Sequence, residues 1–142
     1  MISNNGKILA LITAQLSCER IIKFAEDYAD KLGCELVILT AQPHKTTAQK
    51  RSKDMICLTE LSKKTGRNIE IIYSDSPLTA ILKETAKIDP IHIFVGQGGQ
   101  RSEFLTGLRI YVADSPISVV GTDGIIYSLP GISEDVFTAN NI

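Results

Sequence analysis

Short apolar runs rich in branched residues alternate along this chain with segments whose apolar residues recur at helical spacing. Most of the runs are nearly continuous, which is typical of strands buried on both faces of a parallel sheet. We expect these strands at residues 7–13, 35–41, 68–74, 91–96 and 116–120. Strands separated by helices imply right-handed crossovers. The sequence therefore predicts a Rossmann-like α/β fold, an open five-stranded parallel sheet with helices on both faces.

Residue types that start and stop helices bound the segments between these runs. Serine at an N-cap accepts a hydrogen bond from a free backbone N–H, and glycine after a helix adopts the left-handed conformation that ends it. By these signals we expect N-caps at Ser17, Ser76 and Ser102, and helix stops at Gly33 and Gly66. The helices then cover residues 18–32, a basic stretch that ends before Gly66, residues 77–88 and residues 103–113.

The chain has 142 residues, of which 44% are hydrophobic, and its formal net charge is -1. This length suits one globular domain, and the apolar fraction is sufficient for a packed core. We expect a single domain over residues 1–142, with its core in residues 7–120 and an extension over residues 121–142. Within the extension, residues 125–129 have the apolar character of an additional strand.

Composition also argues against several classes of protein. The balanced charge lacks the strongly basic character of a dedicated nucleic-acid binder. The uninterrupted apolar runs are a few residues long, whereas a membrane-spanning helix needs about 20 residues. The three cysteines form no CxxC motif and no ligand set with histidine, so we expect free thiols in the cytoplasm and no bound metal.

In an open parallel sheet the ligand site lies beyond the carboxyl ends of the strands, where the strand order reverses. The loops that reach this edge follow Thr13, Ala41 and Val95. Glycine lets backbone amides approach a ligand, a helix N-terminus presents free N–H groups, and arginine is suited to phosphate. A tight turn that needs glycine for its dihedral angles explains the glycines equally well. The loop after the fourth run holds all of these features, in Gly96, Gly98, Gly99, Arg101 and Ser102.

Other candidate residues carry weaker signals. His92 lies between apolar neighbours in an expected strand, which favours a structural role, and solvation explains His44 in its polar loop. No nucleophile and histidine fall together at adjacent strand ends, so nucleophilic catalysis is not indicated. Residues 45–67 carry seven lysines and arginines against Asp54 and Glu60. Such a run is typical of a solvated helix face, and the alternative is a patch for an acidic partner or for ligand phosphates.

Several stretches of the chain carry a family resemblance. They are Lys7-Ile8-Leu9, the helix that follows Ser17, the run Leu32-Gly33-Cys34-Glu35-Leu36, residues 91–96 with Gly99, and Ser115-Pro116-Ile117-Ser118-Val119-Val120. Over residues 7–120 the chain thereby resembles the universal stress protein family. It also looks like the stress-protein-type module of sensor kinases that control potassium uptake. The resemblance implies the adenine nucleotide alpha hydrolase-like form of this fold and, usually, a homodimer.

The resemblance also implies a ligand and its contacts. The ATP-binding members hold adenine and ribose near the ends of the first two strands, and hold the phosphates on the loop after the fourth. By this resemblance Thr13, Ala14 and Ala41 lie near the base and ribose of ATP or another adenine nucleotide. The phosphate contacts would then fall on Gly96, Gly98, Gly99, Arg101 and Ser102.

The chain departs from the ATP-binding pattern at two places. Thr13 stands where those members commonly carry an acid at the end of the first strand. Counted back from Pro116, Glu103 and Phe104 occupy the positions of the second glycine and its Ser or Thr, so the phosphate loop is about six residues short.

Two functions follow from these observations. The first is a cytoplasmic, homodimeric regulatory or sensing module that binds an adenine nucleotide and is not an enzyme. The second is a nucleotide-free homodimeric interaction domain for a regulatory protein partner. In that alternative the glycine-rich loop is only a turn, and the fifth strand with residues 125–129 forms the interface. Slow ATP hydrolysis, or recognition of a dinucleotide messenger, ranks third, with Glu103 as the acid near the loop.

Overall fold

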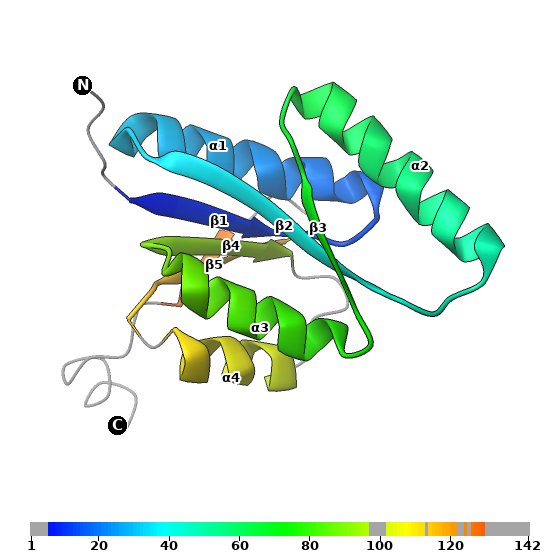
Figure 1. The fold of residues 1–142 in the computed structure, drawn as a ribbon. Coiled ribbons are helices and arrows are strands. Elements are labelled where there is room, and N and C mark those ends of the chain that lie inside the picture. Colours follow the sequence, from blue (N-terminus) through cyan, green and yellow to red (C-terminus); the bar gives the residue numbers. More distant parts are fainter. Residues whose placement is uncertain (1–5, 97–101, 113, 122–123, 125, 130–142) are drawn as a thin grey trace.

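The computed structural model describes residues 6–96, 102–112, 114–121, 124 and 126–129 (Figure 1). Its strands are β1 (Lys7–Leu11), β2 (Glu35–Pro43), β3 (Glu70–Ser74), β4 (His92–Gly96), β5 (Ile117–Val120) and β6 (Ile126–Leu129). Its α-helices are α1 (Glu19–Leu32), α2 (Ala48–Thr65), α3 (Pro77–Ile88) and α4 (Ser102–Tyr111). A short 3₁₀ turn, η1 (Leu16–Cys18), precedes α1.

The strands form one sheet in the order β3-β2-β1-β4-β5-β6. β1 lies between β2 and β4, and every pairing from β3 to β5 is parallel. The predicted five-stranded parallel sheet is therefore confirmed. The additional strand expected at residues 125–129 also forms, as β6, and it pairs antiparallel with β5. A two-residue or slightly longer turn can join antiparallel strands, so β6 needs no crossover helix.

Two of the strands end at other residues than predicted, and β3, β4 and β5 each begin one or two residues later than predicted. β1 ends at Leu11 and not at Thr13, although the amide N–H of Ile12 still donates to Leu39 O at 3.0 Å. β2 runs on to Pro43, two residues beyond its predicted end, because its last residues pair with β3. The inner strand β1 is thus shorter than predicted, and its neighbour β2 is longer.

The helices cover the sheet as two layers. Figure 1 shows α1 and α2 on one face and α3 and α4 on the other. Because successive residues of a strand point to opposite faces, β1 contributes Ile8 and Ala10 to one core and Leu9 and Leu11 to the other. The first core is completed by Ile22, Ala25, Leu58 and Leu61, and the second by Ile81, Leu82, Leu108 and Val112. Burial on both faces accounts for the nearly continuous apolar runs.

The expected glycine stops are confirmed. Gly33 and Gly66 each follow a helix with φ of 68°, in the left-handed region that glycine adopts without a Cβ clash. Near Gly66, Arg67 Nε lies 2.7 Å from Glu26 Oε2, and this ion pair joins the end of α2 to α1.

Of the three expected serine caps, the position of Ser76 is confirmed, whereas those of Ser17 and Ser102 were wrong. Ser17 lies inside η1, and the N-cap position of α1 is Cys18, which makes no side-chain capping bond because its thiol is buried in the core. Ser76 occupies the N-cap of α3, but its side chain makes no capping bond, and its own N–H donates to Ser74 Oγ at 3.0 Å. Ser102 is the first residue of α4 and not its cap.

Candidate functional site

The carboxyl ends of β1, β2 and β4 lie at one edge of the sheet. Leu11 is in register with Leu39 on one side and with Val95 on the other. The structure therefore brings the loop of Thr13 and Ala14 to the same edge as Ala41 and Gly96. The crossover after β1 covers one face of the sheet and the crossover after β3 covers the other, so this edge is where strand order reverses.

The predicted base and ribose residues lie on both sides of this edge. Thr13 is exposed, and its Oγ1 lies 3.6 Å from the sulfur of the buried Cys18. Ala14 is half-buried and packs against the core beneath α1 and α2. Ala41 is also half-buried but packs against the core beneath α3 and α4.

Of the predicted phosphate residues, the structure places Gly96 and the backbone of Ser102. Gly96 ends β4, and α4 begins at Ser102. Gly98, Gly99 and Arg101 lie outside the described residues. A Cβ at Gly96 would stand 2.8 Å from Cδ1 of Ile21, so any larger residue at this position would force the Ile21 side chain of α1 to shift. This packing contact, between residues 75 positions apart, was not visible in the sequence.

Beside Ala14 the surface is hollowed by two adjoining cavities, of ≈ 750 and ≈ 690 Å³. Both are bordered by the connection after β1 and by α2, and they share Ala14, Gln15, Lys53 and Asp54. We call the two together the α2 cleft. The first cavity is also lined by Thr47, Gln49 and Lys50, and the second by Leu16, Ile56, Cys57, Glu60 and Lys64.

The basic stretch of the sequence therefore lies partly on a cavity and not only on a solvated helix face. Lys50 Nζ lies 3.0 Å from Asp54 Oδ2, so this lysine forms an ion pair with the acid one helical turn further along α2. Burial raises the pKa of the Cys57 thiol, and the neighbouring Cys18 and Asp54 raise it further. The sequence indicated the lysines, but nothing in it indicated that Leu16 and Gln15 would face them across a cleft.

Arg51 holds the first turns of α2 against the sheet. One guanidinium nitrogen, Nη2, donates to the carbonyl oxygens of Pro43 and His44, each at 2.7 Å. The same guanidinium lies 4.9 Å from the centre of the Tyr73 ring, close enough for a cation–π contact. At the N-cap of α2, Thr47 Oγ1 accepts from the N–H of Lys50 at 3.1 Å. The wall of the cleft is thus fixed by several contacts.

His92 lies at the opposite, amino end of β4. It is buried, its Nε2 lies 2.7 Å from Ser118 Oγ, and its ring is 4.7 Å from that of Phe94 and 4.6 Å from that of Tyr28. Burial lowers the pKa of this imidazole. A buried histidine with a hydrogen-bond partner fits the structural role that the sequence favoured, and His44 is exposed as expected.

Neither a metal cluster nor a membrane-spanning helix is found in the part of the chain that the structure describes. No group of three or more His, Cys, Asp or Glu side chains there is arranged to hold a metal ion. None of the helices described is both long enough and apolar enough to cross a bilayer.

No protein-family model matches the sequence, and no curated protein sequence matches it. Solved structures of universal stress proteins match its fold. One from Archaeoglobus fulgidus in complex with dAMP is 18% identical, with a TM-score of 0.59 over 84% of this chain and 98% of its own. One from Arabidopsis thaliana with AMP bound is 16% identical, with a TM-score of 0.52 over 82% and 91%.

A third structure, a putative universal stress protein from Pseudomonas aeruginosa, is 15% identical with a TM-score of 0.66. The match covers 83% of this chain and 48% of that one. Together these likenesses show that the chain has the fold of universal stress proteins, as the sequence resemblance implied.

Proposed function

We propose that the chain is a regulatory module of the universal stress type that binds an adenine nucleotide at the carboxyl edge of its sheet. The observation that carries the proposal is the meeting of Thr13, Ala41 and Gly96 at the edge where strand order reverses. Open α/β sheets bind their ligands at this place. The structural relatives that are complexes with dAMP and AMP support an adenine nucleotide as the ligand.

The residues at the edge suit the parts of a nucleotide. Ala14 and Ala41 offer small apolar surfaces to a base, and the exposed hydroxyl of Thr13 can hydrogen-bond a ribose. The phosphate would lie on the loop that follows Gly96, where Gly98, Gly99 and Arg101 precede the first residue of α4, Ser102.

The proposed role is binding and not turnover. In the described part of the chain, His92 lies within hydrogen-bond distance of the hydroxyl of Ser118. This pair is buried at the amino end of β4, away from the proposed nucleotide site. In such a module, the bound nucleotide changes the affinity for a partner, and this change is the regulatory signal. We place it in the cytoplasm, where thiols stay reduced, because no disulfide joins Cys18, Cys34 or Cys57 in the described part of the chain.

The experiment is calorimetric titration of the purified protein with AMP and with ATP, preceded by mass spectrometry of any nucleotide that denaturation releases. We expect a co-purified adenine nucleotide or binding in the micromolar range, with a stoichiometry of one per chain. Absence of both would overturn the nucleotide-binding proposal.

A second function is favoured by one observation, the place of β6 in the sheet. In the described part of the chain β6 is the last strand of the order and pairs with β5 alone. An edge strand presents unpaired backbone groups to a second copy or to a partner protein. In this alternative the chain is a nucleotide-free homodimeric interaction domain. Truncation after Gly121 tests it, since a dimer that persists at the same concentration would exclude β6 as the interface.

A further inference from the structure

We propose that the α2 cleft is a second binding site, for small organic anions that join a flat apolar body to a phosphate, sulfonate or carboxylate group. This site is formed by α2 and the connection after β1, where Ala14 also borders the proposed nucleotide site, and the proposal does not depend on a nucleotide at the glycine-rich loop. Its two adjoining cavities, of ≈ 690 and ≈ 750 Å³, fall within the range of about 300–1,000 Å³ that is usual for small-molecule pockets.

One end of the cleft carries exposed apolar side chains, with Lys53, Asp54, Glu60 and Lys64 around them. Leu16 and Ile56 border it with 49% and 68% of their surfaces exposed, although both are large hydrophobic residues. Cys57 and Ala14 lie beside them, and both also pack against the core beneath α1 and α2. Covering exposed apolar surface is favourable, so this end attracts an apolar ring.

The other end of the cleft is polar and cationic. Thr47, Gln49 and Lys50 line it, and Lys53 stands at the junction of the two ends. Three lysines line the cleft (Lys50, Lys53 and Lys64) against two acids (Asp54 and Glu60). Lys50 forms an ion pair with Asp54, which offsets the charge of that acid. Lysine is a point charge on a flexible stem, which suits it to an anionic group whose position varies between ligands.

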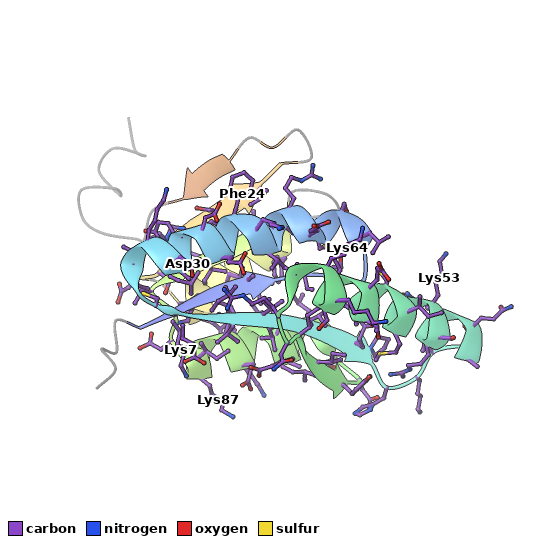
Figure 2. All side chains as sticks on the ribbon, turned by 90° about the horizontal axis from the view of Figure 1, so that it is seen from above. Lys7, Phe24, Asp30, Lys53, Lys64 and Lys87 are labelled. Carbon is purple, nitrogen blue, oxygen red and sulfur yellow. The ribbon has the colours of Figure 1, made fainter. Side chains whose placement is uncertain are left out.

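The spacing along α2 explains how one helix supplies both ends. Lys53 and Lys64 are eleven residues apart, which is about three turns at 3.6 residues per turn. They therefore lie on the same side of α2, and Figure 2 shows both on the upper side of the helix in that view. Ile56, Cys57 and Glu60 fall on the same stripe, at positions three, four and seven after Lys53.

The cleft is also preformed. Arg51 binds the carbonyl oxygens of Pro43 and His44, and the Arg67–Glu26 pair joins the far end of α2 to α1. A wall that is already ordered loses little conformational freedom when a ligand binds.

The probe for this site is 1-anilinonaphthalene-8-sulfonate, which has an aromatic body and one sulfonate. We expect saturable fluorescence enhancement with one probe per chain, and an affinity at least fivefold weaker in Lys53→Glu. The matched control is Lys83→Glu, which reverses the charge of an exposed lysine on α3, on the other face of the sheet. Equal affinity in wild type and Lys53→Glu would overturn the proposal.

Alkylation of the thiols locates the probe. Cys57 lines the cleft, whereas Cys34, which is also half-buried, lies between α1 and the start of β2. We expect a saturating concentration of the probe to slow iodoacetamide alkylation of Cys57 severalfold at pH 8.5 and to leave Cys34 unchanged. Unchanged alkylation of Cys57 would overturn the assignment of the probe to the cleft.

A last variant separates this proposal from the proposed nucleotide site. Gly99→Val should keep the affinity for the probe, because the probe does not use the loop after β4. Loss of probe binding in Gly99→Val would place the probe at the nucleotide site and would overturn a separate cleft. The two proposals therefore fail independently, since nucleotide titration tests one and the Lys53→Glu comparison tests the other.

Discussion

Ile21 of α1 packs directly over Gly96 at the end of β4, with its Cδ1 atom 2.8 Å from the place where a Cβ would stand. The contact brings α1 close to the edge of the sheet where we place the nucleotide. Gly96 is not among the described glycines with positive φ, so the effect of a larger residue here comes from packing against Ile21 and not from backbone conformation. The same glycine thus serves two purposes, a close helix contact and an open approach to the backbone.

Gly96→Ala should therefore destabilise the fold through this contact. Ile21 must turn away from the added methyl group, and overpacking of this kind costs about 1–3 kcal/mol. In an Ile21→Val background, which lacks Cδ1, the same change should cost distinctly less. Urea unfolding of the two single variants and the double variant measures the coupling. Additive effects would show that Gly96 and Ile21 do not compete for space.

Stability should fall as the pH is lowered below the ordinary pKa of histidine, because His92 is held neutral. Burial lowers the pKa of His92 from 6.5, so the unfolded chain takes up this proton more readily than the folded protein. Its contribution is fully present above pH 6.5 and is lost as the pH falls through the folded pKa.

Urea unfolding between pH 8 and pH 5 measures this dependence. His92→Gln should flatten it, whereas the exposed His44 provides the matched control in His44→Gln. An unchanged slope in His92→Gln would contradict the assignment. Loss of the hydrogen bond between His92 and Ser118 should also lower the free energy of unfolding of the His92→Gln variant at pH 8 by about 1 kcal/mol.

Gly99→Val should abolish binding of AMP and ATP and leave the fold intact. A branched side chain in the glycine-rich loop denies a phosphate its approach to the backbone amides. Calorimetry gives the affinity, and circular dichroism with thermal unfolding checks the fold. Wild-type affinity in this variant would remove the loop from the nucleotide site.

Arg51→Lys should destabilise the protein by about 1–2 kcal/mol and weaken binding in the α2 cleft. Lysine keeps the charge, but it lacks the planar guanidinium that reaches two carbonyl oxygens through Nη2 and at the same time lies over Tyr73. The neighbouring Lys50→Ala removes an exposed pair with Asp54 and should cost about 0.5 kcal/mol or less. Equal losses in the two variants would show that Arg51 has no special role.

Ile56→Gln should weaken binding of the anilinonaphthalene probe about fivefold with little change in stability. Ile56 is 68% exposed, so a polar replacement removes apolar surface from the cleft without opening the core. Ile110→Gln is the matched control, since Ile110 is 73% exposed on α4. A uniform effect of both changes would point to general surface binding of the probe.

The sequence was sufficient for the number of parallel strands and their parallel direction, because burial on both faces leaves a continuous apolar run that the local sequence reveals. It was also sufficient for Gly33 and Gly66, whose left-handed conformation is a local property. The end of β2 could not be predicted, because Pro43 stays in the sheet only through its pairing with Ser74.

The α2 cleft escaped prediction for a similar reason. Leu16 and Ile56 are forty residues apart, and they border one cavity only because η1 and α2 meet above the same sheet. The start of α1 was misjudged because the burial of Cys18 in the core outweighed the capping preference of Ser17. Contacts between distant segments decided each of these features.

The antiparallel direction of β6 changes what the margin of the sheet offers to any segment that joins it. Antiparallel pairs alternate narrow and wide hydrogen-bonded rings, whereas parallel pairs space their bonds evenly. With β5 already paired, the template that faces outward among the described residues runs against the five strands behind it. An incoming strand that runs in the direction of β5 would therefore pair antiparallel with β6. Beside β5 itself, the same strand would have paired parallel, so the one short strand β6 reverses the pairing that this edge of the sheet offers.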